Sequence, residues 1–314
     1  MDQQQVKFKV KIKAKPEVKT PKVKIITDSC ADLSDELLRR YNIDYVKMST
    51  ILNGIKSPAL LTWNAKGAHS LYETIRSGKQ VTTAPVSVDE FTRVFTLYLN
   101  AGYDIVYIGC SIKQSKSVPV GHTVSRKLLK DYPDAKIYCI DSLNACIGEG
   151  ILAIEASKMA AAGKNADEIA ASIITMRNNV NEYATVHTLE YLRRARRVSA
   201  SSAFFGNLMG VKPILIADAA GAQAGYKKVK GRENSLNEIV RLMKETIINP
   251  EEQTIYLAHA DCPQQDIDYL VNRVKAEIPC KEIYTWFIGP IIGASVGPDA
   301  IGIWALGEEV TFLG

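Results

Sequence analysis

The sequence lacks the motifs by which common enzyme classes are recognised. Four histidines are spread over 314 residues, and the six cysteines form no Cys-x-x-Cys pair. There is no Walker loop, no Gly-x-Ser-x-Gly elbow, no Gly-x-Gly-x-x-Gly after a strand and no zinc pattern. We therefore expect no cofactor, no metal and no catalytic residue, and we expect buried free thiols rather than disulfides.

Long hydrophobic runs are also absent. No segment approaches the roughly 20 apolar residues that a membrane-spanning helix needs, and the N-terminus lacks the apolar core of a signal peptide. Because 46% of the residues are hydrophobic and 23% are charged, the chain can still bury a sizeable core. We predict a cytoplasmic protein of two domains without stable membrane insertion.

Positive charge is concentrated at the N-terminus. Residues 1–24 hold eight lysines against Asp2 and Glu17, a net charge of +6, which leaves about −1 for the rest of the chain. That remainder has no basic stripe interleaved with aromatics, so we expect no nucleic-acid partner. Residues 6–14 alternate apolar residues with lysine, which fits either a soluble tail or an edge strand protected by lysines. We assign residues 1–22 to a basic N-terminal arm.

Residues 23–179 are predicted to form an N-terminal α/β domain. An apolar strand begins at Val23 and meets a helix that Asp28 or Ser29 would cap, which would leave unpaired N–H groups near Ser29 for an anion. Further strands are expected at 43–52, 105–109 and 136–140, with a turn at Asn53-Gly54 and a hydroxyl-rich loop at 81–87. The expected helices lie around 71–75, 91–99, 122–129, 148–163 and 166–179.

This alternation of strands and helices predicts a parallel, Rossmann-like sheet with helices on both faces. Ligands of such sheets lie at the carboxyl ends of the strands, where Ser29, Ser111 and Ser142 should meet. Residues 180–314 are predicted to form a second α/β domain with a smaller mixed sheet. Its expected strands lie at 183–187, 211–216, 254–259, 282–287 and 303–306.

Four motifs, in the same order, resemble those of the DegV family of bacterial fatty-acid-binding proteins. Residues 27–33 match Thr-Asp-Ser-x-x-Asp-Leu, and residues 82–85 are similar to Thr-Ser-x-Pro. Residues 141–150 resemble Asp-Ser followed by Gly-x-Gly, and residues 289–298 resemble Gly-Pro-x-x-Gly-x-His-x-Gly-Pro. The resemblance covers residues 23–314 and omits the basic arm.

The resemblance implies two α/β domains, the EDD fold, with a lipid cleft between them. It implies a carrier for a long-chain fatty acid that presents the carboxylate to a separate ATP-dependent fatty-acid kinase for phospholipid synthesis, and not an enzyme in itself. Hydroxyl groups would hold the carboxylate. The ligand-binding residues implied in this sequence are Ser29, Thr82, Thr83, Ser111, Ser295 and Arg197.

Three positions depart from the family pattern. The Ser-Ser-x-x-Ser-Gly-Thr motif survives only as Cys110-Ser111, and the Gly-Gly-Arg-Ile segment retains only Arg197. The closing histidine is Ser295, a neutral donor that should hold a carboxylate less strongly than an imidazolium would. We expect Arg197 and its neighbouring arginines to form a basic patch near the mouth of the site, although a solvated helix end would look the same in sequence.

Two alternatives to the carrier function follow from the residues. A divergent paralogue could bind another lipid or act as a regulatory binding protein. A small hydrolase or transferase could use Cys30, because a thiol at a helix N-terminus has a lowered pKa. His187 and His259 lie in apolar segments and are expected to be core residues, whereas His69 and His122 are expected at the surface.

Overall fold

The computed structural model describes residues 22–199 and 210–314, and the predicted alternating segment of the arm lies outside these ranges. The described part of the chain contains three sheets. The first is a four-stranded parallel sheet in the order β2 (Asp44–Val46), β1 (Val23–Asp28), β6 (Asp104–Gly109) and β7 (Ile137–Asp141).

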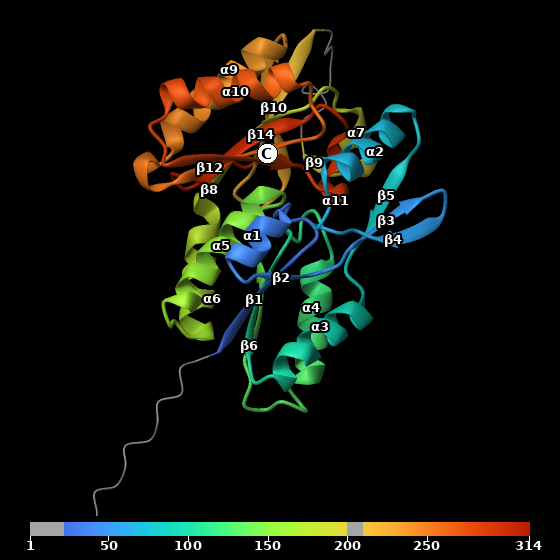
Figure 1. Cartoon of the computed structure of the whole chain (residues 1–314), viewed down its shortest axis with the longest axis vertical. Helices are drawn as coiled ribbons and strands as arrows, with labels where there is room; N and C mark the ends of the chain where they lie inside the picture. Colours follow the sequence, from blue (N-terminus) through green and yellow to red (C-terminus); the bar gives the residue numbers. More distant parts are fainter. Residues whose placement is uncertain (1–21, 200–209) are drawn as a thin grey trace, which may run out of the picture.

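Helices cover both faces of the parallel sheet, as predicted. Side chains alternate along a strand, so Ile25 of β1 packs into the core beneath α5 (Ile147–Ala161) and α6 (Ala166–Met176). Ile26 packs on the opposite face, in the core beneath α3 (Val88–Asn100) and α4 (Ser117–Leu128). Figure 1 shows the two helix pairs on either side of the strands.

The segment after β1 differs from the prediction. The first helix does not begin at Asp28 or Ser29: α1 spans Asp35–Arg40, and the Ser34 hydroxyl caps it by accepting the Leu37 N–H. Asp32 has a left-handed backbone (φ 48), which no helix continues through. Asp28 instead accepts the Cys30 N–H, so this N–H is not free for an anion.

The predicted strand at 43–52 is in fact two strands in two sheets. β2 pairs with β1, whereas β3 (Ser49–Leu52) pairs with β4 (Ile55–Pro58) and β5 (Val81–Ala84) in a small antiparallel sheet. The Asn53-Gly54 turn between β3 and β4 is confirmed, because both residues have the positive φ that such hairpins require. The predicted loop at 81–87 begins with strand β5, so that part of the prediction is wrong.

The second large sheet is mixed, as expected, but its seven strands make it larger than the parallel sheet rather than smaller. Helices α9 (Arg232–Thr246) and α10 (Gln264–Glu277) cover its outer face (Figure 1). The short helices α7 (Glu190–Ala195) and α11 (Pro290–Val296) lie near its inner face, and 3₁₀ turns occupy Arg177–Asn179 and Pro250–Glu252. The strand order is β13 (Glu282–Phe287), β12 (Thr254–His259), β14 (Ile301–Leu306), β8 (Val180–Thr185), β10 (Val211–Ala217), β11 (Gln223–Lys230) and β9 (Val198–Ser199).

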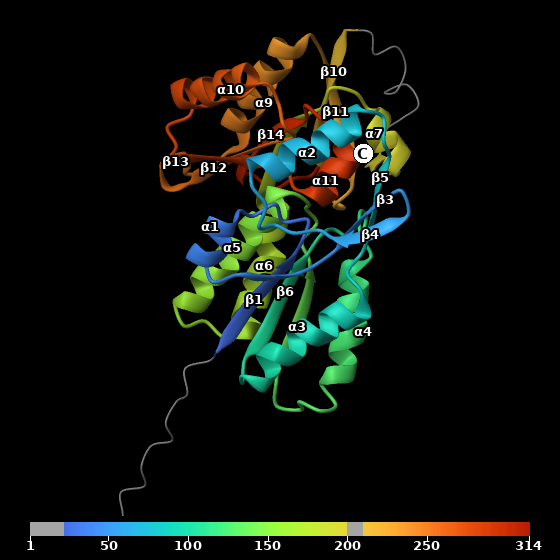
Figure 2. The ribbon, with the colours of Figure 1, turned by 45° about the vertical axis from the view of Figure 1, so that its right-hand side comes forward.

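Helix α2 (Ala65–Arg76) comes from the first half of the sequence but packs on the second. The Tyr72 hydroxyl donates to the Ile288 carbonyl over 2.7 Å, and the Arg76 guanidinium contacts the carboxylates of Asp261 and Asp299 at 2.7 and 2.9 Å. Figures 1 and 2 both show α2 beside α11. The two halves are therefore joined by more than the chain connection at residues 179–180.

Helix α5 is buried between the parallel sheet, α6 and the seven-stranded sheet. Ten of its fifteen residues are buried, and they lie on nearly all sides of its N-terminal part, which is typical of a helix largely enclosed by the core. Gly150 allows it to approach the turn that follows β1, since a Cβ at position 150 would lie 2.7 Å from the Ala31 carbonyl oxygen. Among the described residues, no helix is both long enough and apolar enough to cross a bilayer.

Candidate ligand-binding cavity

A cavity of about 370 Å³ lies between the two large sheets. The first half of the chain contributes Met48 and Ala145 to its wall, and the second half contributes Leu215, Ile291 and Trp304. Its volume lies in the range of small-molecule sites, roughly 300–1,000 Å³. We call this space the main cavity.

A smaller cavity of about 180 Å³ adjoins it and is more polar. Thr82, Gln80, Lys79 and Arg194 are among the residues that line this polar cavity. Thr83, Ser295 and Arg197 line both cavities. The structure therefore brings together three of the six site residues that the resemblance implies, at the junction of an apolar space and a polar one.

Three separate elements position this junction. Thr83 lies on β5, opposite Thr50 of β3, and Ser295 lies in the last turn of α11. Arg197 follows α7, which ends because Arg196 adopts a left-handed conformation (φ 55). The side chains of Thr83 and Ser295 make no hydrogen bond within the described part of the chain, and Arg197 contacts no carboxylate there. All three groups therefore remain able to bind a ligand.

The other three implied residues are placed differently. Thr82 is exposed and lines only the polar cavity. Ser29 is fully buried: its hydroxyl donates to the Ala59 carbonyl over 2.8 Å and accepts the Met48 N–H over 3.0 Å. Ser111 is also buried and accepts the Lys113 N–H. Ser29 and Ser111 line neither cavity and instead hold loops in place.

The carboxyl ends of β1 and β6 form a buried polar network. One Asp28 oxygen accepts the Cys30 N–H, and the other accepts the Tyr107 hydroxyl at 2.7 Å and the Cys110 N–H at 3.3 Å. Burial raises the pKa of Asp28, and the same cause raises the pKa of Glu149 well above its ordinary value. The Thr-Asp-Ser motif thus serves as scaffold for the loops that border the cavity.

Sequence reasoning missed several polar residues of the main cavity. Lys113 and Lys116 line it, from the segment that departs from the family pattern, and add positive charge at its edge. Glu182 lines it from β8 and accepts a 2.8 Å hydrogen bond from Gln223 of β11. Burial raises the pKa of Glu182 to about 7. The position of Glu182 beside an apolar strand segment could have indicated a buried carboxylate. Its partner Gln223 could not be identified, because strand β11 was not predicted.

The structure removes the physical basis for Cys30 as an activated nucleophile. Cys30 does not lie at a helix N-terminus, and its thiol is buried beside Cys110, which raises its pKa well above the ordinary value. The cysteines are free thiols, as predicted, and five of the six are buried. His259 is a buried core residue whose pKa burial lowers to about 4, whereas His187, predicted to be in the core, is exposed.

The fold and the cavity are those of an α/β protein with two large sheets and an apolar space between them. Residues 22–308 match a family described as "Uncharacterised protein, DegV family", and the chain therefore belongs to the DegV family. A DegV domain-containing protein of Clostridium perfringens is 32% identical over 290 residues, which cover 90% of this chain and 97% of that protein.

Solved structures with the same fold include proteins described as binding fatty acids. A fatty-acid-binding DegV family protein from Thermus thermophilus superposes with a TM-score of 0.81 at 21% identity, covering 91% of this chain and all of that one. A stearic-acid-binding protein from Eubacterium ventriosum gives 0.80 at 21% identity, covering 91% and 98%. DegV of Bacillus subtilis, described as a fatty-acid-binding protein, gives 0.79 at 22% identity, covering 92% and 100%.

Proposed function

We propose that this protein binds a long-chain fatty acid, with the acyl chain in the main cavity and the carboxylate at Thr83, Ser295 and Arg197. The observation that carries the proposal is that these three residues, alone among those the structure describes, line both the apolar and the polar cavity. A fatty acid needs such a junction, because its chain gains free energy by leaving water while its carboxylate needs hydrogen-bond donors.

The charges around the junction support an anionic head group. Arg197 offers a guanidinium that can bind a carboxylate through two parallel hydrogen bonds. Lys113 and Lys116 add two further cations along the main cavity. The solved DegV relatives described as fatty-acid-binding support the same class of ligand.

Lipid extraction and a binding titration test the proposal. Protein purified from cells would be denatured, and the released lipid identified by mass spectrometry. Delipidated protein would then be titrated with stearate. Arg197→Ala should weaken binding about tenfold or more, because it removes a charge-assisted hydrogen bond. Arg126→Ala, on the exposed surface of α4, is the matched control and should bind as the parent does.

Absence of lipid in the extract together with no measurable stearate binding would overturn the proposal. Equal affinity of Arg197→Ala and Arg126→Ala would leave fatty-acid binding intact but place the carboxylate elsewhere.

We further propose that the protein is a cytoplasmic carrier that hands the carboxylate to a separate ATP-dependent kinase. The carboxylate would lie next to the polar cavity, where Lys79 and Arg194 could meet an acidic kinase surface or a phosphate. Formation of acyl phosphate from ATP, bound stearate and a purified fatty-acid kinase tests this step. The rate of acyl phosphate formation should fall as salt rises. An equal rate without this protein would contradict the proposal.

One observation favours a second candidate, a divergent paralogue that binds a different lipid. Ser295 supplies a neutral hydroxyl where the family pattern has histidine. Such a site discriminates less strongly between a carboxylate and a neutral head group. Identification of the extracted lipid as an uncharged species would support this candidate over the fatty-acid carrier.

A further inference from the structure

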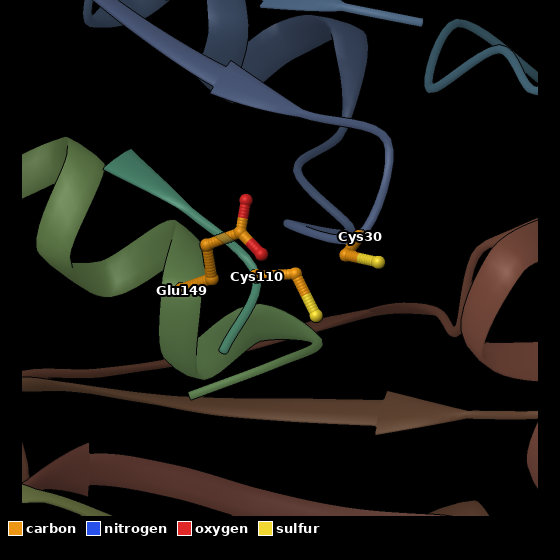
Figure 3. A group of neighbouring side chains, drawn as sticks. All are labelled: Cys30, Cys110 and Glu149. Carbon is orange, nitrogen blue, oxygen red and sulfur yellow. The ribbon is translucent and has the colours of Figure 1, made fainter. Parts of the chain in front are cut away.

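Two thiols that line the main cavity lie close to a buried carboxylate behind them. Cys30 follows β1, Cys110 follows the neighbouring strand β6, and Glu149 lies in the first turn of α5. One candidate ligand atom from each residue lies within 4.8 Å of the other two, and all three residues are buried. Figure 3 shows the three side chains as neighbours that come from three separate segments of the chain.

We propose that Cys30, Cys110 and Glu149 bind one Zn²⁺ ion, whose fourth coordination position faces the main cavity. Two thiolates with one carboxylate form a ligand set that zinc accepts, and three protein ligands with an open position are typical of zinc sites that bind a further molecule. This inference does not rest on the proposed lipid ligand, since the ion would be held by protein atoms alone.

The hydrogen bonds of Glu149 provide a second, independent observation. Its Oε1 accepts the Thr27 hydroxyl over 2.6 Å and the Asp28 N–H over 3.3 Å, whereas its Oε2 is buried without a partner. A buried carboxylate oxygen without a partner is costly, and a cation would satisfy it. Thr27 and Asp28 hold the carboxylate as outer-shell groups commonly hold the ligands of a metal.

The geometry needs only small adjustments to hold the ion. Tetrahedral zinc with bonds of about 2.3 Å to sulfur places two thiolates about 3.8 Å apart. Rotation of the cysteine side chains can bring the ligand atoms from their present spacing of at most 4.8 Å to that value. For Cys30 this rotation breaks the 3.4 Å contact that its thiol donates to the Met48 sulfur. Cys30 and Cys110 both line the main cavity, so water or a ligand there can reach the fourth position.

One other cluster among the described residues has suitable side chains, namely His69, Glu73 and Asp261. It is a weaker candidate because His69 and Glu73 are exposed and Arg76 already pairs with both carboxylates. A cation at that place would have to displace the arginine.

Metal titration of the full chain tests the proposal. Chelator-treated, delipidated protein should bind one Zn²⁺ in competition with a chromophoric chelator. Co²⁺ in its place should give the charge-transfer absorption of thiolate ligation. Cys30→Ser, Cys110→Ser and Glu149→Gln should each weaken Zn²⁺ binding by at least about tenfold. The glutamine keeps an oxygen that can accept from Thr27 and Asp28, so this variant should fold.

Two controls make the result specific. Cys146→Ala removes another buried thiol that lines the main cavity but lies outside the cluster, and it should bind Zn²⁺ as the parent does. His69→Ala should also leave binding unchanged. If the serine variants do not fold, the parent itself can be alkylated, and Zn²⁺ should slow modification of Cys30 and Cys110 but not of Cys146.

The proposal fails if the parent binds no Zn²⁺ or if Co²⁺ gives no thiolate charge-transfer band. It also fails if His69→Ala abolishes binding, or if Zn²⁺ protects the three cysteines equally from alkylation.

Discussion

Two groups of hydroxyl-bearing residues resemble each other in sequence but differ in the structure. At the ends of β1 and β6, Ser29 and Ser111 are buried and bonded to the backbone. At the cavity junction, Thr83 and Ser295 are part-buried and make no side-chain hydrogen bond within the described residues. The comparison teaches that such a hydroxyl is available to a ligand only if it is not already hydrogen-bonded within the folded protein.

The largest effect should follow from removal of the carboxylate that organises the strand ends. Asp28→Ala leaves three donors, the N–H groups of Cys30 and Cys110 and the Tyr107 hydroxyl, without their acceptor. We expect the free energy of unfolding to fall by about 3 kcal/mol or more. Urea unfolding in the presence of a metal chelator measures this free energy. Asp134→Ala, at an exposed turn, should change the value by less than about 0.5 kcal/mol.

The strand-end region should also respond to pH through Asp32. Burial raises the pKa of Asp32 to about 8, more than the nearby Cys146 thiol and Gly289 N–H lower it. The unfolded chain has already lost this proton above pH about 4. The stability that Asp32 contributes is therefore complete below pH about 4 and is lost as pH rises to about 8, at up to about 1.4 kcal/mol per unit.

Urea unfolding of the parent and of Asp32→Asn between pH 5 and 9 measures this slope, which the variant should lack. His259, in the other sheet, should act with the opposite sign. Burial lowers its pKa to about 4, so its contribution is complete above pH about 6.5 and is lost as pH falls to about 4. For Asp32, an equal pH dependence of the free energy of unfolding in the parent and in Asp32→Asn would mean that its carboxyl is solvated in the folded protein.

Paired substitutions of Ser29 and Ser295 by alanine separate the two groups directly. Ser29→Ala should lower the free energy of unfolding by about 1–3 kcal/mol, since it leaves the Met48 N–H and the Ala59 carbonyl unpaired, without changing stearate affinity. Ser295→Ala should leave stability within about 0.5 kcal/mol and weaken stearate binding several-fold. Calorimetric unfolding and stearate titration give both quantities. If Ser29→Ala instead weakened stearate binding and Ser295→Ala lowered the free energy of unfolding, the assigned roles of the two serines would be wrong.

A further substitution at position 295 should give a gain of affinity. Ser295→His should tighten stearate binding by about tenfold at pH 6, because an imidazolium forms a stronger hydrogen bond to a carboxylate than a neutral hydroxyl does. The gain should be smaller at pH 8, where the imidazole is neutral. Titrations of both proteins at the two pH values test this, and equal affinities would mean that position 295 does not face the head group.

Much of the fold could be predicted because its elements carry strong local patterns. The predicted strands β1 and β6 agree with the structure to within one or two residues, and the predicted helix at 91–99 lies within α3, which begins three residues earlier. The split between β2 and β3 and the existence of β5 were not predictable in this way. They depend on pairing between residues as far apart in sequence as Ser49 and Ala84, which no local pattern records.

The candidate site was predictable only in part. Thr83, Ser295 and Arg197 are indicated by the family resemblance. Ser29 and Ser111 are indicated both by that resemblance and by their place at strand ends, yet they lie in the scaffold. The sequence does not indicate that Cys110 and Glu149 lie close together, because their proximity depends on how β6 and α5 pack. Burial and hydrogen bonding decide which polar residue is available, and both are properties of the folded chain.

The position of α2 has a consequence for how this protein can be divided. A cut between residues 179 and 180 would separate the two large sheets in sequence, yet Tyr72 and Arg76 would remain on the first fragment while their partners lay on the second. The two pieces would each carry a surface shaped for the other. Co-expressed, they should reassemble as a split protein, whereas either piece alone would lack part of its own interior.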